Sequence, residues 1–265
     1  MLIAVNGVEL AVSSHGEGDA LLLVHGFTGC PQSMRPWGEF LAAAGLTVEG
    51  PRLPGHGTRL EDMLPTRWDD WYGEAERSFS ALRSRCDEVF AMGLSMGGAV
   101  CLRLAEVHPA DVAGLVLVNA AVTSADKRLV LMPVLKHLVK AFPGISNDIK
   151  KPGATELAYD KTPLRALASL QDAWRMVRAD LSKITCPVVH YRSREDHVVD
   201  PSSSVYLNRD VPDLVEVILE NSYHVATLDN DAQQIFEGSL KFVRDNAAPR
   251  QGEDARRSGA EPTGR

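Results

Sequence analysis

Short runs rich in apolar residues recur along the chain, and the one at residues 20–24 is apolar throughout and ends in a glycine-containing turn. These runs cover residues 20–24, 46–49, 89–92, 112–121, 187–192 and 215–219. A short strand that is apolar on both faces is typical of a parallel sheet covered by helices. Helical spacing is found between the runs, at residues 36–44, 68–85 and 98–107. The alternation predicts an α/β fold, with a mostly parallel central sheet flanked by helices.

One long segment, at about residues 122–183, interrupts this alternation and is too long for a simple crossover between strands. Its first part carries more apolar side chains than one amphipathic helix face requires. They lie at residues 129–135 and at Leu138, Val139, Phe142 and Ile145. We interpret the segment as a small cap over an active site. The alternative is a set of extra core helices, and both interpretations can hold for different faces of the same segment.

The chain organisation predicts one domain at residues 1–246 that includes this cap insertion. Its first residues, 1–16, predict short strands, and no internal repeat is visible. Residues 247–265 are rich in Ala, Gly, Arg and acidic residues and nearly lack large apolar ones. They are predicted to form a disordered tail.

The strand at 89–92 runs directly into Gly93-Leu94-Ser95-Met96-Gly97, which is followed by a helical stretch. A sharp strand-to-helix turn lifts the serine hydroxyl out of the backbone, and it needs the two glycines so that strand and helix can approach closely. Ser95 is therefore the candidate nucleophile. The strand at 20–24 ends in a turn of its own, where the backbone N–H of Phe27, together with that of Met96, could bind a developing oxyanion.

A nucleophilic serine needs a histidine base and an acid that orients it, and after such a turn they follow in the order serine, acid, histidine. The strand at 187–192 is followed by Asp196, and the strand at 215–219 is followed by His224. His224 alone among the histidines follows the last predicted strand. For the acid, Glu195 and Asp200 stay open beside Asp196, which is the first choice.

These residues resemble the alpha/beta-hydrolase family, and within it bacterial carboxylesterases and monoacylglycerol lipases. The motifs that carry the resemblance are residues 22–29, 52–57, 93–98, 195–199 and 222–229. The resemblance implies Ser95, Asp196 and His224 as the catalytic residues, with Phe27 and Met96 as oxyanion donors. Residues 147–159 look like the cap of bacterial monoacylglycerol lipases, which implies that Ile145 lines the substrate passage. It also implies that Glu156 receives the hydroxyls of a glycerol head group, whereas the alternative for Glu156 is a surface carboxylate at a helix start.

The expected function is hydrolysis of carboxylic esters of acyl chains, most of all monoacylglycerols, through an acyl-enzyme intermediate. The alternatives are a short-chain carboxylesterase, an acyl thioesterase, or a receptor that keeps the hydrolase fold and binds a ligand without turnover. A haloalkane dehalogenase or epoxide hydrolase is disfavoured, because those enzymes place a carboxylate where Ser95 stands.

Composition adds expectations about partners and environment. The formal net charge of −7 argues against nucleic acid, and no phosphate-binding or dinucleotide glycine motif is present, so no cofactor is expected. The four cysteines lack metal-site spacing and are expected to be reduced thiols, with no metal site. The sequence shows no targeting segment or apolar run long enough to span a membrane, which predicts a cytoplasmic location and at most transient contact with membrane surfaces.

Overall fold

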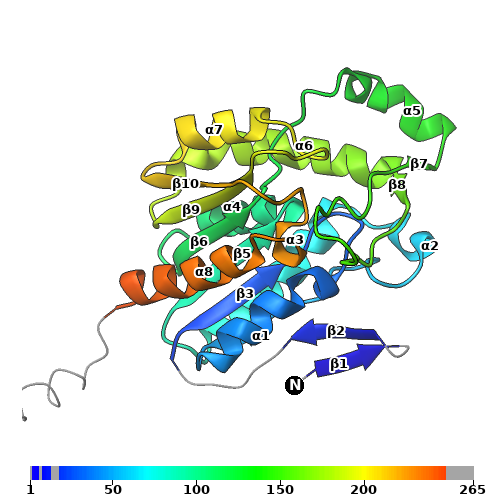
Figure 1. Cartoon of the computed structure of the whole chain (residues 1–265). Helices are drawn as coiled ribbons and strands as arrows, with labels where there is room; N and C mark the ends of the chain where they lie inside the picture. Colours follow the sequence, from blue (N-terminus) through cyan, green and yellow to red (C-terminus); the bar gives the residue numbers. More distant parts are fainter. Residues whose placement is uncertain (1, 6–7, 13–17, 249–265) are drawn as a thin grey trace, which may run out of the picture.

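The centre of the protein is a parallel six-stranded sheet (Figure 1). The structure is a computed structural model, and it describes residues 2–5, 8–12 and 18–248. The strands lie in the order β10-β9-β6-β5-β3-β4, and every neighbouring pair is parallel. Their bounds are β3 Ala20–Val24, β4 Thr47–Glu49, β5 Val89–Leu94, β6 Val112–Val118, β9 Val188–Ser193 and β10 Leu214–Leu219. The predicted α/β fold is confirmed.

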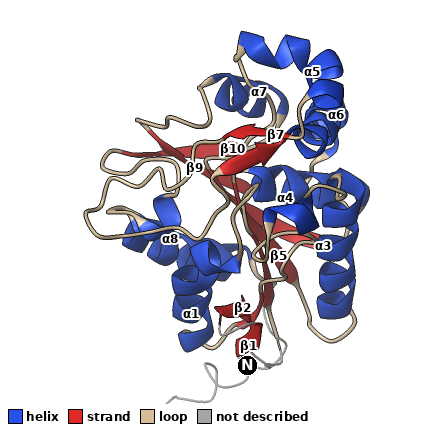
Figure 2. Cartoon of the chain, turned by 90° about the vertical axis from the view of Figure 1, so that its right-hand side faces the viewer, coloured by secondary structure: helices blue, strands red, loops and turns tan. Residues whose placement is uncertain are grey.

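Helices cover both faces of the sheet. Helices α1 and α8 lie on one face and α3 and α4 on the other (Figure 2), and α6 packs against α3 and α4. The helices of the main body are α1 Arg35–Ala43, α2 Leu60–Met63, α3 Trp68–Arg83, α4 Met96–Val107, α6 Leu164–Asp180, α7 Ser202–Asp210 and α8 Ala232–Asn246. Short 3-10 helices are η1 Pro31–Met34, η3 Leu181–Lys183 and η4 Ala226–Leu228.

The continuous apolar sequence of β3 is explained by two cores, one on each side of the sheet. In β3, Leu22 belongs to the core under α3 and α4, whereas Leu21 and Leu23 belong to the core under α1 and α8. Because successive side chains of a strand point to opposite faces, every position of β3 must be apolar. Each fully buried leucine stabilises the fold by about 1.5–3 kcal/mol.

The long insertion divides into two parts. Its first part holds η2 Lys127–Leu131, α5 Met132–Leu138 and a small antiparallel pair, β7 Ala141–Pro143 with β8 Lys161–Pro163. Helix α5 and β7 stand away from the central sheet (Figure 1). Helix α6 instead buries Ala166, Leu170 and Val177 in the main core. Helix α6 therefore belongs to the main core, whereas η2 and α5 leave several large apolar side chains exposed. The interpretation of the insertion as a cap stays a prediction.

Element bounds differ from the sequence prediction where the backbone turns. The strand predicted at 112–121 ends at Val118, because Asn119 adopts a left-handed backbone with φ of 45°. The helix after Ser95 begins at once, at Met96. At the amino terminus, β1 Leu2–Val5 pairs with β2 Val8–Val12 as an antiparallel hairpin. The predicted tail lies outside the described residues except for Ala247 and Ala248.

Candidate active site

Ser95 occupies the single residue between the end of β5 and the start of α4. Its backbone has φ of 56° and ψ of −118°, a conformation that typically costs about 1–3 kcal/mol for a residue with a side chain. A Cβ atom at Gly97 would lie 2.0 Å from the Val24 carbonyl oxygen, and one at Gly93 would lie 2.3 Å from the Gly97 carbonyl carbon. The steric reason for the two glycines is therefore visible in the packing.

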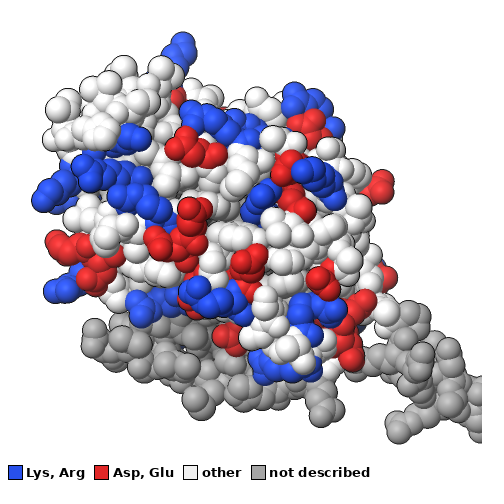
Figure 3. All heavy atoms as spheres, turned by 180° about the vertical axis from the view of Figure 1, so that it is seen from behind, with Lys and Arg blue, Asp and Glu red and all other residues white. Residues whose placement is uncertain are grey.

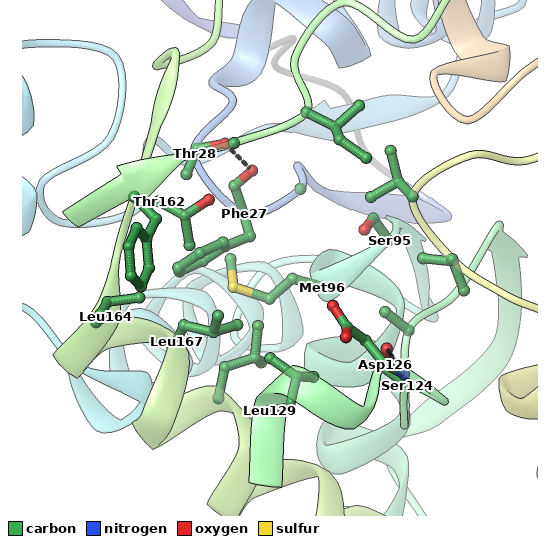
Figure 4. Close-up of a pocket in the computed structure, with 18 of the residues that line it drawn as sticks. Phe27, Thr28, Ser95, Met96, Ser124, Asp126, Leu129, Thr162, Leu164 and Leu167 are labelled. Carbon is green, nitrogen blue, oxygen red and sulfur yellow. Dashed lines mark hydrogen bonds between the residues drawn. The ribbon is translucent and has the colours of Figure 1, made fainter. Parts of the chain in front are cut away.

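The surrounding backbone holds this strained turn in place. The N–H of Ser95 donates to the carbonyl of Val118 at 2.9 Å. Its carbonyl accepts hydrogen bonds from the N–H of Gly98 at 3.0 Å and of Ala121 at 3.1 Å. Ser95 is thus tied to α4 and to the end of β6, and its side chain lines a cavity (Figure 4).

The loop after β3 lies against Ser95. A Cβ atom at Gly26 would be 3.9 Å from the Ser95 Oγ, so the loop backbone approaches the serine closely. Phe27 and Met96 both line the same cavity as Ser95 (Figure 4). Met96 is the first residue of α4, where backbone N–H groups have no partner within the helix and the dipole favours negative charge. The structure thus brings the two predicted oxyanion residues to the serine.

Asp196 and His224 meet beside the carboxyl ends of β9 and β10. The His224 Nδ1 and the Asp196 Oδ2 are 2.8 Å apart, and both side chains are buried. The other Asp196 oxygen accepts hydrogen bonds from the N–H groups of Val198 and Val199, each at 2.8 Å. His224 also lines the cavity that holds Ser95.

The electrostatics of this pair favour ionised Asp196 beside a basic His224. Burial opposes ionisation of Asp196, but the charge and hydrogen bond of His224, together with the backbone hydrogen bonds from Val199 and Val198, outweigh it and hold the pKa of Asp196 below its ordinary value. Burial likewise disfavours protonated His224, yet the charge of Asp196 and its hydrogen bond, followed by the charges of Glu156 and Asp148, raise the pKa of His224 above its ordinary value. His224 therefore gains proton affinity from its carboxylate neighbours.

The two other carboxylates left open by the sequence lie elsewhere. Glu195 is exposed and pairs with the Lys150 ammonium at 3.4 Å. Asp200 accepts the N–H of Ala125 at 2.7 Å and that of Ser202 at 2.9 Å. Of the three candidates, Asp196 is the carboxylate that the structure hydrogen-bonds to His224.

Several other histidines are held neutral in the interior or bound to other groups. Burial lowers the pKa of His25 to about 4 and that of His190 to about 4, and it lowers the pKa of His56 strongly. The rings of His25 and His56 meet edge to face at 5.0 Å under the loop that carries Phe27. They support that loop as neutral packed rings.

The cavity above Ser95 has a volume of about 640 Å³ and is lined in part by residues of the long insertion. Glu156 and Ile145 both line it. A Cβ atom at Gly29 would lie 2.9 Å from a Glu156 carboxylate oxygen, which places Glu156 against the loop after β3. Burial raises the pKa of Glu156, against the opposing charge of His224. Much of the apolar lining comes from η2, α5, β7 and α6: Leu129, Leu131, Met132, Leu135, Phe142, Leu164, Leu167, Leu170 and Trp174.

Sequence reasoning missed Asn119, which joins the ends of β6, β9 and β10. Its Oδ1 accepts the N–H of Ser193 at 2.7 Å, and its Nδ2 donates to the carbonyl of His224 at 2.8 Å. Asn119 is buried and links the strand before the acid loop to the histidine loop. The available signal was an asparagine inside the run predicted as a strand at 112–121, because Asn tolerates the left-handed backbone that ends the strand there.

Across residues 2–5, 8–12 and 18–248, no group of three His, Cys, Asp or Glu side chains is placed to hold a metal ion. Over the same residues, none of the helices is long and apolar enough to cross a membrane. Cys30, Cys86, Cys101 and Cys186 are free cysteines. The expectations of no cofactor and no nucleic-acid partner stay predictions.

The chain is similar to hydrolases along most of its length. The family described as serine aminopeptidase, S33, matches residues 17–231. A thermostable monoacylglycerol lipase of Bacillus sp. (strain H-257) is 44% identical over 229 residues, which make up 86% of this chain and 91% of that protein. A carboxylesterase of Bacillus subtilis (strain 168) is 29% identical over 233 residues, covering 86% of this chain and 93% of that protein.

Solved structures of lipolytic hydrolases are also similar to this chain. A structure reported for the metagenome-derived lipolytic enzymes LipS and LipT superposes with a TM-score of 0.86 at 39% identity, covering 89% of this chain and 97% of that one. The monoacylglycerol lipase of Paleococcus ferrophilus, at 20% identity and a TM-score of 0.75, covers 91% of this chain and 100% of that one and shares the fold. The chain therefore belongs to the serine aminopeptidase S33 family of alpha/beta-hydrolases, and its lipase and carboxylesterase relatives identify it as a carboxylic ester hydrolase.

Proposed function

We propose that this enzyme hydrolyses monoacylglycerols to fatty acid and glycerol, with Ser95 as nucleophile, His224 as general base and Asp196 as the acid that orients the histidine. The observation that carries the proposal is a shared cavity. Ser95 and His224 lie in it together with Glu156, and apolar side chains of the cap region line much of the remainder. A cavity that is mostly apolar with a few polar groups suits an acyl chain with a polar head.

The chemistry follows from the hydrogen bond between His224 Nδ1 and Asp196, because this bond leaves Nε2 to exchange protons with the serine. Nε2 takes the Ser95 proton while Oγ bonds to the ester carbonyl carbon, and the backbone N–H groups of Phe27 and Met96 bind the oxyanion. The leaving alkoxide receives that proton from His224, which gives an acyl-enzyme. Water then loses a proton to His224 and attacks the acyl carbon, the proton returns to Ser95, and the fatty acid leaves.

We assign Glu156 to the glycerol head group and Ile145 to the substrate passage. A carboxylate can accept both free hydroxyls of a monoacylglycerol, and burial strengthens such bonds. The position of Glu156 against the loop that carries Phe27 supports this assignment. Ile145 is 59% exposed and lines the cavity, as expected for a residue at an opening.

The test is a comparison of Glu156→Ala and Glu156→Gln with the wild type on a monoacylglycerol and on a nitrophenyl ester of the same acyl chain. We expect KM for the monoacylglycerol to rise about ten-fold in Glu156→Ala, because lost hydrogen bonds to a charged group cost about 1.5–3 kcal/mol. KM for the nitrophenyl ester should change less than two-fold. The KM of Glu156→Gln for the monoacylglycerol should lie between those of the wild type and Glu156→Ala. Equal effects of a substitution on both esters would contradict the head-group role.

The preferred acyl chain separates the lipase from its alternatives. We expect kcat/KM to rise from short to longer monoacylglycerols, because each methylene buried in the cavity contributes about 0.8 kcal/mol. Cleavage restricted to short nitrophenyl esters would favour a general short-chain carboxylesterase. Faster hydrolysis of acyl thioesters than of matched esters would favour a thioesterase. Activity that survives in Ser95→Ala would contradict the nucleophile assignment itself.

We further propose that the outer cap surface, defined as Val130, Val134 and Leu138, contacts anionic lipid surfaces transiently. These three side chains are 62–78% exposed on η2 and α5. Residues 122–140 contain four basic residues and one acidic residue, against a net charge of −7 for the chain. In Figure 3 the upper-left lobe, where α5 lies when seen from behind, is largely uncharged and has Lys and Arg side chains beside it.

Vesicle flotation tests this contact. The Val130→Ser/Leu138→Ser double variant should bind phosphatidylglycerol vesicles several-fold more weakly than the wild type, because it removes apolar groups that enter the interface. High salt should weaken wild-type binding, because the basic residues near the surface attract anionic lipid. Equal vesicle binding by the variant and the wild type would contradict the proposal. A variant at the exposed Val215 of β10, far from the cap in Figure 1, serves as the matched control.

A further inference from the structure

Asp148, in the loop between β7 and β8, reaches from the insertion into both loops that carry the proposed acid and base. Its Oδ2 accepts the backbone N–H of His224 and the backbone N–H of His197, each at 3.2 Å. Its Oδ1 lies 2.8 Å from the His197 Nδ1. The side chain of Asp148 is 10% exposed. One carboxylate therefore touches His224 itself and the residue directly after Asp196.

The backbone of the same segment is bound along the histidine loop. The Asp148 carbonyl accepts the N–H of Val225 at 3.1 Å. Asp229 accepts the N–H groups of Lys150 and Lys151 at 2.7 and 2.8 Å, and also that of Tyr223 at 2.8 Å. The segment 148–151 is thus tied to residues 223–229, which places Asp148 beside His224 through neighbouring contacts as well as its own.

His224 is consequently held from two directions. Its N–H is bound by Asp148 from the insertion, and its carbonyl accepts the side-chain amide of Asn119 from the end of β6. The adjacent residue Asn147 accepts the N–H of Glu156 through its Oδ1 at 2.8 Å. Two consecutive residues therefore connect the proposed head-group carboxylate to the proposed base.

From these contacts we infer that Asp148 is a positioning residue for catalysis, which fixes His224 against Asp196. The geometry of the base then depends on the contacts between the insertion and the histidine loop. The inference rests on the proposed roles of Ser95, Asp196 and His224. A base that is displaced by about 1 Å loses roughly a hundred-fold in rate. Asp148 does not line the cavity around Ser95, so it acts through His224 and not on the substrate.

The first test compares Asp148→Ala with the wild type in nitrophenyl ester hydrolysis and in the rate of Ser95 labelling by a fluorophosphonate. We expect kcat and the labelling rate to fall roughly ten- to a hundred-fold. KM should stay within two-fold, because the cavity lining is unchanged. A folded Asp148→Ala protein, judged by circular dichroism, with kcat and labelling within two-fold of wild type would overturn the inference.

Asp148→Asn separates geometry from charge and decides the matter if the alanine variant does not fold. An asparagine Oδ1 can still accept the two backbone N–H groups, so kcat at high pH should stay within about three-fold of wild type. Three carboxylates raise the pKa of His224, namely Asp196, Glu156 and Asp148. Removal of one charge should move the acid limb of kcat/KM to lower pH. An unchanged acid limb, or a loss of kcat as large as that expected for alanine, would overturn the inference.

Asp160→Asn is the matched control, because it removes one carboxylate from an exposed site in the same insertion. We expect it to leave kcat and the acid limb unchanged, and an equal shift there would assign the Asp148 effect to overall charge and overturn the inference. Failure of the proposed function gives a different result. In that case the fluorophosphonate would label wild type and Ser95→Ala at the same rate, independently of any change at Asp148.

Discussion

The strained backbone at Ser95 predicts that glycine at this position stabilises the protein more than alanine does. Ser95 holds φ of 56° and ψ of −118° between β5 and α4. Ser95→Ala removes the hydroxyl but keeps the Cβ atom that makes this conformation unfavourable. Ser95→Gly removes the hydroxyl and the Cβ atom together. Both variants lack the proposed nucleophile and are expected to be equally inactive. Their difference in stability reports the relief of backbone strain, reduced by the extra freedom that glycine gives the unfolded chain.

The expected difference is about 1 kcal/mol in the free energy of unfolding. Strain in a sparsely populated backbone region costs about 1–3 kcal/mol, and glycine relieves it. Against this, glycine gives the unfolded chain more freedom, which lowers stability by about 0.5–1 kcal/mol. For a domain of this size, a net gain of about 1 kcal/mol raises the Tm by about 2–4 °C.

Urea unfolding and calorimetry of the two variants measure this difference directly. The exposed Ser80 in α3 provides the control, because the helical conformation there is unstrained. At that position glycine should be less stable than alanine by about 1 kcal/mol, the opposite sign. If Ser95→Gly proved no more stable than Ser95→Ala while the Ser80 pair behaved as expected, the argument for strain at the serine turn would be refuted.

Two further predictions follow from packing and charge. Gly97→Ala places a Cβ atom 2.0 Å from the Val24 carbonyl oxygen and should destabilise the fold by about 3 kcal/mol or more, whereas Gly45→Ala, with a φ of +91° but no atom within 4 Å, should cost about 1–2 kcal/mol. Thermal unfolding of both variants checks this, and equal losses would contradict the close approach of α4 to β3. The pKa of His224 is raised, so kcat/KM should fall with decreasing pH through a midpoint above the usual histidine value of about 6.5. In Asp196→Asn that midpoint should move to lower pH, and a pH–rate profile without this shift would contradict the assignment of Asp196 as the partner of His224.

Local patterns in the sequence determined the fold class and the elements around the site. Strand β3 is apolar at every position because its side chains alternate between two cores. A short stretch of consecutive residues is enough to recognise this pattern. The serine turn is also marked by consecutive residues, in which Gly93 leaves room for the backbone of Gly97, and Gly97 leaves room for the Val24 carbonyl of the neighbouring strand β3. The strand ends that carry Asp196 and His224 could also be placed from the sequence, because parallel strands direct their carboxyl ends to one edge of the sheet.

Tertiary structure alone decided which loop residues meet. Asp196, Glu195 and Asp200 are close in sequence, and only the folded loop directs Asp196 to His224. The contact of Asp148 with the N–H of His224 spans 76 positions in the chain, and nothing in the composition of either loop specifies it. Hydrogen bonds between loops depend on backbone direction at both ends, which is set by the packing of the elements beneath them. Hydrophobic periodicity therefore determined the scaffold of this protein, whereas the alignment of its candidate base was decided by contacts that exist only after the scaffold has formed.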